Sequence, residues 1–543
     1  MSPVMRNWFV IAILAVSQFV MILDSTVMNV SISEVAADLD TTITGMQAAI
    51  TFYTLTMAAF MLTGGKFGDL WGRTRAFKIG SIIYGLGSLI TAISPNLPTL
   101  LVGWSLIEGL GAVLVIPAIA ALAAVNYTGK ARVTAFSILG AVTGLAAAVG
   151  PLIGGLVTTY LSWRYVFAAE TVVMIGVLLV SGRISDEARD RQTRIDPLSV
   201  VLSAGGMALV VLGVLQSKTW GWLAPLNPPE IGDTTIAPLG VSPVAYLILI
   251  GAVILWIFVN RQQALSRTGR QPLLNVRLLR IGALRSGLAG FLVQYFAIAA
   301  LFFVVPVYLQ TMLGKDAMQT GLKILPLSAG LVVFSVLGSW LTARRSTRFI
   351  ARVGQLTMAV GILLTLGAVE PALRGALFAV GMFVVGAGFG LLASQLGNAN
   401  MSAVEERDTS EVGGLQGTFQ NLGSSFGTAI VGSVFILLLG SGFTTSVQDA
   451  QTLSPSQKQQ ITTSLNETGV PIISEADAQA LVARAGGSDD AAAEVGDLYA
   501  DSQIQALKQA LFIVFALTVL SLLASRRLPD RIAGEDTADD RSD

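Results

Sequence analysis

The sequence predicts an all-α protein that crosses a membrane many times, and its composition and long apolar stretches lead to this prediction. Of the 543 residues, 53% are hydrophobic and 13% are charged, and the mean hydropathy is +0.70. Water-soluble globular domains of this size are much more polar. About fourteen stretches of roughly 20 apolar residues occur, each long enough to cross the hydrocarbon core as a helix and too long for the strands of a membrane barrel.

The expected membrane helices follow one another along the whole chain. Lys and Arg are concentrated on alternate connecting segments, and the positive-inside rule then places both termini in the cytoplasm. The apolar run after Arg6 lacks a small-residue cleavage site, so we expect the first helix to be retained rather than removed as a signal peptide. The expected centres lie near Val16, Met57, Leu86, Gly111, Ala147, Ile175, Met207, Ile250, Ala299, Val332, Ile362, Val384, Ile430 and Ala516.

The polar segments divide these helices into a 6+2+6 arrangement. Residues 1–182 are expected to form an N-terminal six-helix bundle, and residues 183–285 hold cytoplasmic linkers and two inserted transmembrane helices. Residues 286–525 are expected to form a C-terminal six-helix bundle that includes an extracellular loop at about 441–504. Residues 526–543 are expected to form a cytoplasmic tail.

Composition argues against several classes of function. The chain contains no Cys and no His, which removes disulfides, thiolate chemistry and His-liganded zinc. No nucleotide-binding loop of the form G-x-x-x-x-G-K-(S/T) occurs, so no cofactor and no metal are expected. The formal net charge is zero and no basic tract indicates nucleic-acid binding. No pair of nucleophile and base is evident, so we do not expect an enzyme.

A charged motif, TGGKFGDLWGRTRAF (63–77), occupies the cytoplasmic turn between the second and third expected helices. Gly65 and Gly68 would let helices approach closely, and Asp69 could form a charged clasp with Arg73 and Arg75. An ordinary loop that follows the positive-inside rule is the alternative interpretation.

This motif resembles the G-x-x-x-D-(R/K)-x-G-R-(R/K) signature of the major facilitator superfamily. Gly65, Asp69, Gly72 and Arg73 match the signature. Leu70 and Thr74 replace residues that are usually basic, and Arg75 is a candidate substitute. The resemblance implies that Asp69 helps to latch the two halves in the outward-facing state.

A second motif, LDSTVMNVSI (23–32), closes the first expected helix and resembles the signature of the drug:proton antiporter branch of that superfamily. Met21, Asp24 and Met28 fall on one helical stripe, so a carboxylate lies between two polarizable thioethers that suit an adaptable cavity wall. Alternatively, Asp24 is a snorkelling or capping residue near the outer end of the helix.

A third motif, AVGPLIGG (148–155), resembles the G-P-x-x-G-G motif of exporters in the superfamily. Gly150, Pro151, Gly154 and Gly155 all match it. Proline lacks an N–H, and beside small residues it makes a pliable and closely packed helix interface. The resemblance implies export, whereas simple packing is the alternative.

Residues 97–125 contain Glu108 as their one charged residue. The family's R-x-x-(Q)-G-x-G-A signature aligns with SLIEGLGA (105–112), so Ser105 replaces the usual arginine and Glu108 replaces a neutral glutamine. We place Glu108 about 15 Å deep, near the middle of the membrane, where an ionised carboxylate is costly and a proton-binding site is favoured. Trp104 lies one helical turn away, so the two side chains could together receive an organic cation.

Three further residues complete the predicted proton-coupling and substrate cavity. Glu170 is a third membrane acid, and Gln294 and Tyr295 could line the cavity from the second bundle. For each acid, a neutral carboxyl that is hydrogen-bonded between helices is the alternative, and most of the aromatic residues are expected to pack or to face lipid.

The resemblance covers nearly the whole chain and implies a fourteen-helix major facilitator fold. The implied activity is secondary active export of amphipathic or cationic drugs in exchange for protons, by alternating access. A dedicated exporter of a lipid, natural product or metabolite, not necessarily driven by protons, is one alternative, and a non-transporting membrane sensor or scaffold is another. Small amphipathic substrates, protons and membrane lipid are the expected partners of a monomer in a bacterial inner membrane.

Overall fold

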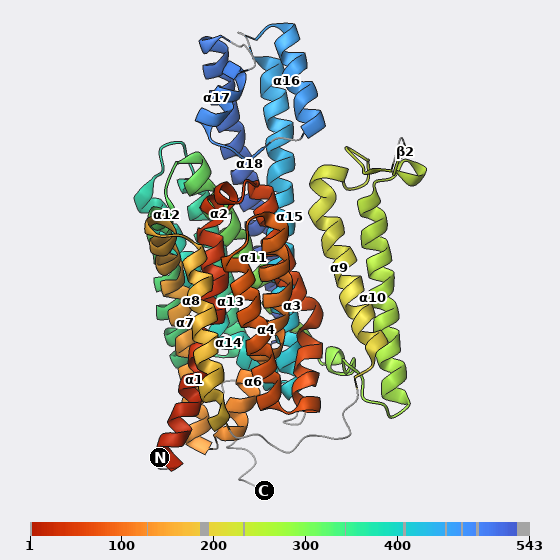
Figure 1. Ribbon diagram of the computed structural model, residues 1–543, viewed down its shortest axis with the longest axis vertical. Helices are drawn as coiled ribbons and strands as arrows, with labels where there is room; N and C mark the ends of the chain where they lie inside the picture. The colour runs from red at the N-terminus through yellow and green to blue at the C-terminus, as the bar shows by residue number, and fades with distance from the viewer. Residues whose placement is uncertain are drawn as a thin grey trace.

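The computed structural model describes residues 3–127, 129–184, 195–231, 234–342, 344–404, 409–450, 453–468, 471–484 and 488–528. Long helices packed side by side form the main body, and a two-helix hairpin stands beside it (Figure 1). Within the described ranges, β-structure is confined to one short antiparallel pair, β1 (Glu230–Ile231) and β2 (Thr234–Thr235).

The N-terminal part of the main body contains the three predicted membrane acids, Asp24, Glu108 and Glu170. In this part α1 packs against α7, and α4 lies between α6 and α8. Its helices are α1 (Pro3–Val30), α2 (Ile32–Asp38), α3 (Ile43–Trp71), α4 (Arg73–Ala92), α5 (Leu97–Leu100), η1 (Leu101–Glu108), α6 (Gly109–Asn126), α7 (Gly129–Tyr160), α8 (Arg164–Val180) and η2 (Ser181–Arg183).

The C-terminal part is built in the same manner. Here α14 packs against α12 and α13, α11 packs against α15, and α18 contacts α13 and α15. The two parts meet mainly where α7 contacts α12 and where α3 contacts α15. The helices are η4 (Leu278–Arg280), α11 (Gly282–Val307), η5 (Tyr308–Met312), α12 (Ala317–Leu341), α13 (Thr347–Ala368), α14 (Gly375–Met401), α15 (Thr409–Asp449), α16 (Pro455–Thr468), α17 (Glu475–Arg484), α18 (Asp489–Ala524) and η7 (Ser525–Arg527).

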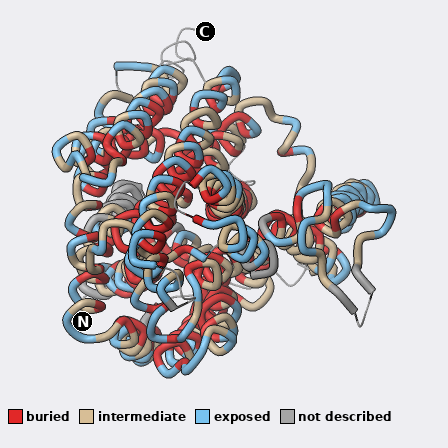
Figure 2. Tube along the Cα trace, turned by 90° about the horizontal axis from the view of Figure 1, so that it is seen from above, coloured by how far each residue is buried: buried red, intermediate tan, exposed pale blue. Residues whose placement is uncertain are grey.

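The hairpin consists of α9 (Pro197–Trp220) and α10 (Pro243–Arg267), joined by a segment that contains β1, β2 and η3 (Pro238–Gly240). It projects from one side of the main body when the molecule is seen from above (Figure 2). α9 contacts α3 and α15, one helix from each part of the body. Asp196 caps α9 by accepting a hydrogen bond from the Ser199 N–H, and it also accepts bonds from Arg261 Nε (2.6 Å) and Nη2 (2.8 Å) on α10. These bonds connect the beginning of α9 to α10 and so stabilise one end of the hairpin.

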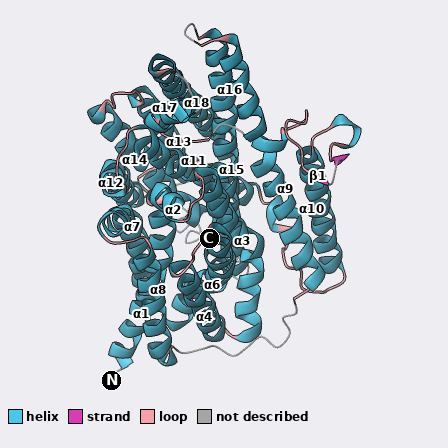
Figure 3. Ribbon diagram, turned by 45° about the horizontal axis from the view of Figure 1, so that its top comes forward, coloured by secondary structure: helices cyan, strands magenta, loops and turns pink. Residues whose placement is uncertain are grey.

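The segment expected as an extracellular loop at about 441–504 is largely helical. α15 and α18 continue beyond the main body and carry α16 and α17, and we call this assembly the cap (Figures 1 and 3). The Tyr499 hydroxyl donates to the Pro471 carbonyl and accepts from the Ile473 N–H, and its ring packs edge-on against Phe443 at 5.1 Å. The cap is therefore a packed unit with its own aromatic centre.

All fourteen predicted centres lie within helices. Among the described residues, twelve helices are long and apolar enough to cross a membrane. Two of the helices that contain predicted centres are not among these twelve. They are α4, which begins with Arg73 and Arg75 and carries Lys78, and α8, which has only 17 residues. The chain is therefore a multi-pass membrane protein, whereas fourteen crossings and the 6+2+6 division remain predictions.

Candidate functional site

The three membrane acids that the sequence placed on separate helices meet in the structure. Asp24 lies on α1, Glu108 is the last residue of η1, and Glu170 lies on α8. One carboxylate oxygen from each lies within 4.8 Å of the other two. Their exposed fractions are 0%, 0% and 2%, respectively. We call Asp24, Glu108 and Glu170 the acid cluster.

Neutral side chains from two neighbouring helices donate to this cluster. The Trp104 indole Nε1–H donates to Asp24 Oδ1 at 2.8 Å. The Tyr84 hydroxyl and the Ser88 hydroxyl each donate to Glu170 Oε2 at 3.4 Å. Among the described residues, none of the ion pairs includes a member of the acid cluster.

Four oxygens of the cluster have no hydrogen-bond partner although they are buried: Asp24 Oδ2, both oxygens of Glu108, and Glu170 Oε1. Buried polar atoms are normally paired, because losing water without gaining a partner costs free energy. These oxygens can accept protons or a cation that enters the cluster.

η1 positions two residues of the site and is a π-helix rather than an α-helix. The sequence predicted Trp104 and Glu108 on one α-helical face, acting together. Instead the Trp104 indole turns to Asp24, and its ring stacks on Tyr53 with centroids 4.7 Å apart and an interplanar angle of 4°. Short π-helical segments are frequent at functional sites. A Cβ added at Gly87 would lie 2.5 Å from the Glu108 nitrogen, so α4 supports this turn directly.

The remaining predicted residues of the N-terminal part are buried around the cluster. Met21 and Met28 lie on the same buried face of α1 as Asp24, with exposed fractions of 5% and 0%. Ser105, which replaces the family arginine, donates to the Ala49 carbonyl of α3 at 2.8 Å. Its hydroxyl therefore joins η1 to α3.

Gln294 and Tyr295 lie on α11, in the C-terminal part. Gln294 Nε2 donates to the Phe389 carbonyl of α14 at 3.4 Å, and Tyr295 packs against the rings of Phe291 and Phe389. Their contacts connect α11 with α14. The structure does not bring these two residues together with the acid cluster.

The G-P-x-x-G-G motif forms the contact between α7 and two other helices. A Cβ at Gly150 would lie 2.0 Å from Thr26 Oγ1, and a Cβ at Gly154 would lie 3.0 Å from Val27, both on α1. A Cβ at Gly155 would lie 2.6 Å from the Ala317 carbonyl oxygen of α12. At Gly321 of α12, an added Cβ would lie 2.4 Å from the Pro151 carbonyl oxygen. The expected close packing at this motif is confirmed.

The loop motif at residues 63–77 differs from the expectation. The prediction that Gly65 and Gly68 permit close helix approach is wrong, because a Cβ at either position would meet nothing within 4 Å. The close approach occurs at Gly64, where a Cβ would lie 2.1 Å from the Val113 carbonyl oxygen of α6. Gly72 separates α3 from α4 with φ of 93°, which glycine adopts without strain.

The charged members of this motif stand at the same turn. Arg73 and Arg75 occupy the first turn of α4, the former half-buried and the latter exposed. The side chain of Asp69 lies outside the described part of the structure, so the predicted clasp stays a prediction.

The two parts of the body are joined on the side that carries the cap. Gln310 of η5 donates to the Val30 carbonyl and accepts from the Ser33 N–H at 3.2 Å. The Met318 N–H donates to Thr159 Oγ1 at 3.0 Å. Together with the Gly155 contact, these bonds hold α1 and α2 against η5, and α7 against α12.

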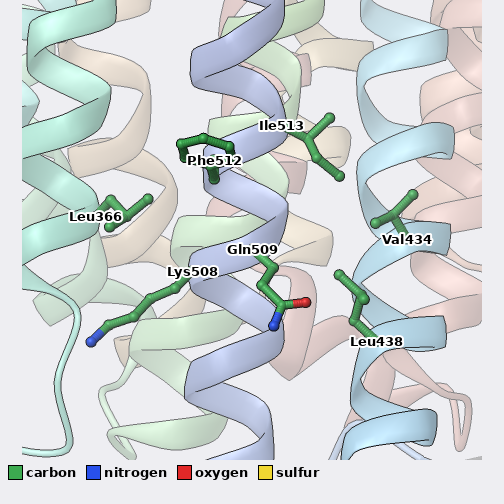
Figure 4. Close-up of a pocket in the computed structure, with 7 residues that line it drawn as sticks. All are labelled: Leu366, Val434, Leu438, Lys508, Gln509, Phe512 and Ile513. Carbon is green, nitrogen blue, oxygen red and sulfur yellow. The ribbon is translucent and has the colours of Figure 1, made fainter.

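An apolar groove lies elsewhere, between α13, α15 and α18, and its volume is about 460 Å³ (Figure 4). It belongs wholly to the C-terminal part and does not include the acid cluster. Its lining residues are Leu366, Val434, Leu438, Lys508, Gln509, Phe512 and Ile513.

Sequence reasoning missed Tyr53, Tyr84 and Ser88. Tyr84 and Ser88 are four residues apart, so they occupy one face of α4. A polar pair at this spacing in an apolar helix was a usable signal. Tyr53 offered no such signal, because its place depends on the packing of α3 against η1.

Two packed sets of membrane-length helices and a buried set of carboxyls are typical of a membrane transporter. The chain belongs to the Major Facilitator Superfamily, whose sequence model matches residues 14–428. It is a transporter of small molecules rather than an enzyme, as the motifs implied.

Relatives and solved structures agree with this family. The chain is 28% identical to the probable actinorhodin transporter of Streptomyces coelicolor, over 82% of this chain and 75% of the relative. It is 31% identical to a puromycin resistance protein of Streptomyces alboniger, over 68% and 67%, and 25% identical to the multidrug resistance protein Stp of Mycobacterium tuberculosis, over 78% and 75%.

Among solved structures, a bacterial homologue of the human lysosomal transporter Spinster, inward-facing and unoccupied, has a TM-score of 0.61 at 14% identity. The alignment covers 96% of this chain and 98% of that one. A D-xylose-proton symporter has a TM-score of 0.54 at 12% identity, over 78% and 89%. At these identities the likeness concerns the fold alone.

Proposed function

We propose that the chain exports amphipathic, often cationic, antibiotics and drugs in exchange for protons. Three relatives from bacteria carry names that refer to antibiotic transport, antibiotic resistance or multidrug resistance, and these names support export. The observation that carries proton exchange is the acid cluster, three buried carboxyls within 4.8 Å of one another. A membrane-buried acid without a basic partner is a natural proton-binding group.

Alternating access links the cluster to transport. Protons neutralise the cluster from outside, and the substrate competes with them from the cytoplasm. Each ligand shifts the equilibrium between the inward-facing and outward-facing states only because it binds one of these states more tightly than the other. The positive-inside pattern supports cytoplasmic termini and an external cap. On this assignment the Gln310 and Gly155 contacts close the external side. The bacterial relatives support a location in a bacterial inner membrane, where the chain acts as a monomer surrounded by lipid.

A second candidate is a dedicated exporter of a lipid or natural product that is not driven by protons. Ser105 favours it, because the family links proton movement to the arginine that this serine replaces. A non-transporting sensor is the third candidate, and it requires that substitutions in the acid cluster leave function unchanged.

The test uses the purified chain in proteoliposomes, with ethidium as the transported cation and an imposed pH gradient. We would compare the wild type with Asp24→Asn, Glu108→Gln and the control Glu370→Gln, whose carboxylate pairs with Arg374 on an exposed surface. Gradient-driven transport that is abolished in the two cluster variants and retained in the control supports the proposal. Transport that ignores both the gradient and the substitutions would contradict it and favour the second candidate.

A further inference from the structure

We infer that the acid cluster holds two protons in the state described here and exchanges both in each transport cycle, so that antiport of a monovalent cation moves net charge. This inference rests on the proposed proton exchange and assigns its stoichiometry. It depends on the geometry of the cluster and on the groups that surround it.

Side chains from five helices face the acid cluster. The packed elements contribute Asp24 from α1, Tyr53 from α3, Tyr84 and Ser88 from α4, Trp104 and Glu108 from η1, and Glu170 from α8. Every one of these side chains other than the three acids is neutral. Among the described residues no cation pairs with these acids. Three buried carboxylates at these separations would therefore repel one another strongly, because Coulomb interactions are weakly screened in a buried site.

Few hydrogen-bond donors among the described residues reach the acid cluster. One Trp104 N–H at 2.8 Å and two hydroxyls at 3.4 Å reach the cluster, and four carboxyl oxygens remain without a partner. Two protons shared among the three carboxyls remove two of the three negative charges and give two of the carboxyls an O–H that can donate to a neighbouring oxygen. One negative charge then remains, and Asp24 is the place for it because the Trp104 N–H is the shortest of the donor contacts.

Exchange of two protons for one monovalent cation moves net charge across the membrane in each transport cycle. Two O–H bonds break when the cluster opens to the cytoplasm, and two protons pass to water while a monovalent cation binds. After export of the cation, two protons from outside re-form the two O–H bonds. Two positive charges enter for each one that leaves, so an inside-negative membrane potential drives export in addition to the pH gradient.

Infrared spectroscopy of the purified chain at neutral pH counts the protons. The C=O stretch of protonated carboxyls is separated from that of carboxylates and shifts in D₂O. We expect two buried protonated carboxyls in the wild type, one in Glu170→Gln, none in the triple variant Asp24→Asn/Glu108→Gln/Glu170→Gln, and two in the control Glu370→Gln. A single protonated carboxyl in the wild type, or a wild-type signal that persists in the triple variant, would overturn the inference without any appeal to folding of the variants.

A null-point measurement tests the exchange itself. In proteoliposomes with the potential clamped to zero by K⁺ and valinomycin, we would find the ethidium gradient that balances each pH gradient. A slope of two between the logarithms of the ethidium and proton ratios is expected for the wild type, and a slope of one for Glu170→Gln. A wild-type slope of one refutes the inference while leaving proton antiport intact. Failure of the pH gradient to move ethidium refutes the proposed function, and the infrared count then decides whether the two-proton site exists.

Discussion

The indole N–H of Trp104 donates to Asp24 Oδ1 at 2.8 Å, and this bond joins η1 to α1 at the centre of the N-terminal part. The Trp104 ring is 1% exposed and stacks on Tyr53, so it cannot rotate away without disturbing α3. Asp24 is thereby fixed in position by a neutral donor rather than by a cation. The orientation of the acid cluster thus depends on an aromatic residue.

Trp104→Phe tests this dependence. Phenylalanine keeps an aromatic ring against Tyr53 but leaves the Asp24 oxygen without its donor, which costs about 1–3 kcal/mol for a buried group. We expect a lower thermal unfolding temperature in detergent and slower gradient-driven ethidium transport. Trp163→Phe is the matched control, because Trp163 donates to the partly exposed Asp38 at 2.9 Å. Equal losses in the two variants would show that the bond to Asp24 has no special role.

Adjacent glycines in the loop motif should respond differently to alanine. Gly64→Ala would place a methyl group against the Val113 carbonyl oxygen, and overpacking of this kind costs about 1–3 kcal/mol. Gly65→Ala has open space and should leave the unfolding temperature unchanged. If Gly65→Ala abolishes transport at unchanged stability, Gly65 makes its close contact in another state of the transport cycle. Similar unfolding temperatures for the two variants would contradict the assignment of the contact to Gly64.

Gly155→Ala should weaken the contact between α7 and α12 on the side of the main body that carries the cap. The added methyl group would lie 2.6 Å from the backbone oxygen of Ala317, so α7 and α12 must separate. We expect faster reaction of a thiol reagent with a single cysteine introduced at Thr159, and the chain contains no other cysteine. The control is Gly176→Ala on α8, where nothing lies within 4 Å of the added Cβ. Unchanged labelling in Gly155→Ala would argue that this contact does not keep the side closed.

Asp196, which directly precedes the membrane-length segment of α9, makes a pH-dependent contact with Arg261. The Arg261 guanidinium, together with the Ser199 hydroxyl and N–H, holds the pKa of the Asp196 carboxyl well below its usual range. Because the pKa is depressed in the folded chain, the stabilisation is present above the usual value near 3.8 and is lost as the pH falls through the folded value.

Asp196→Asn should therefore loosen the α9–α10 hairpin at neutral pH, because the amide oxygen can still cap α9 but no longer forms charged hydrogen bonds with the Arg261 guanidinium. Hydrogen exchange of α9 measures the effect, and the difference from wild type should shrink as the pH is lowered below the usual carboxyl range. An equal difference at all pH values would indicate that the charge of Asp196 is irrelevant.

Local sequence patterns predicted where the helices lie, because a membrane-length apolar stretch is a property of each segment alone. They could not predict that Asp24, Glu108 and Glu170 meet, since this depends on how α1, η1 and α8 pack. The π-helical form of η1 has no local signature, so the orientation of Trp104 toward Asp24 was not foreseen. The family motif drew attention to Gly65, whereas the close contact belongs to its neighbour Gly64, because motif matching identifies positions and not the faces they present.

The length of α15 and α18 has a mechanical consequence. With 41 residues, α15 is about 60 Å long, roughly twice the thickness of the hydrocarbon core. Both helices are rooted in the C-terminal part and carry the cap at their far ends (Figure 1). A rotation of that part by about 10° would displace a point 30 Å along such a rod by roughly 5 Å. Such a rotation would make the cap a lever arm that magnifies small tilts of the C-terminal part, and a dye attached to one introduced cysteine there would report each tilt.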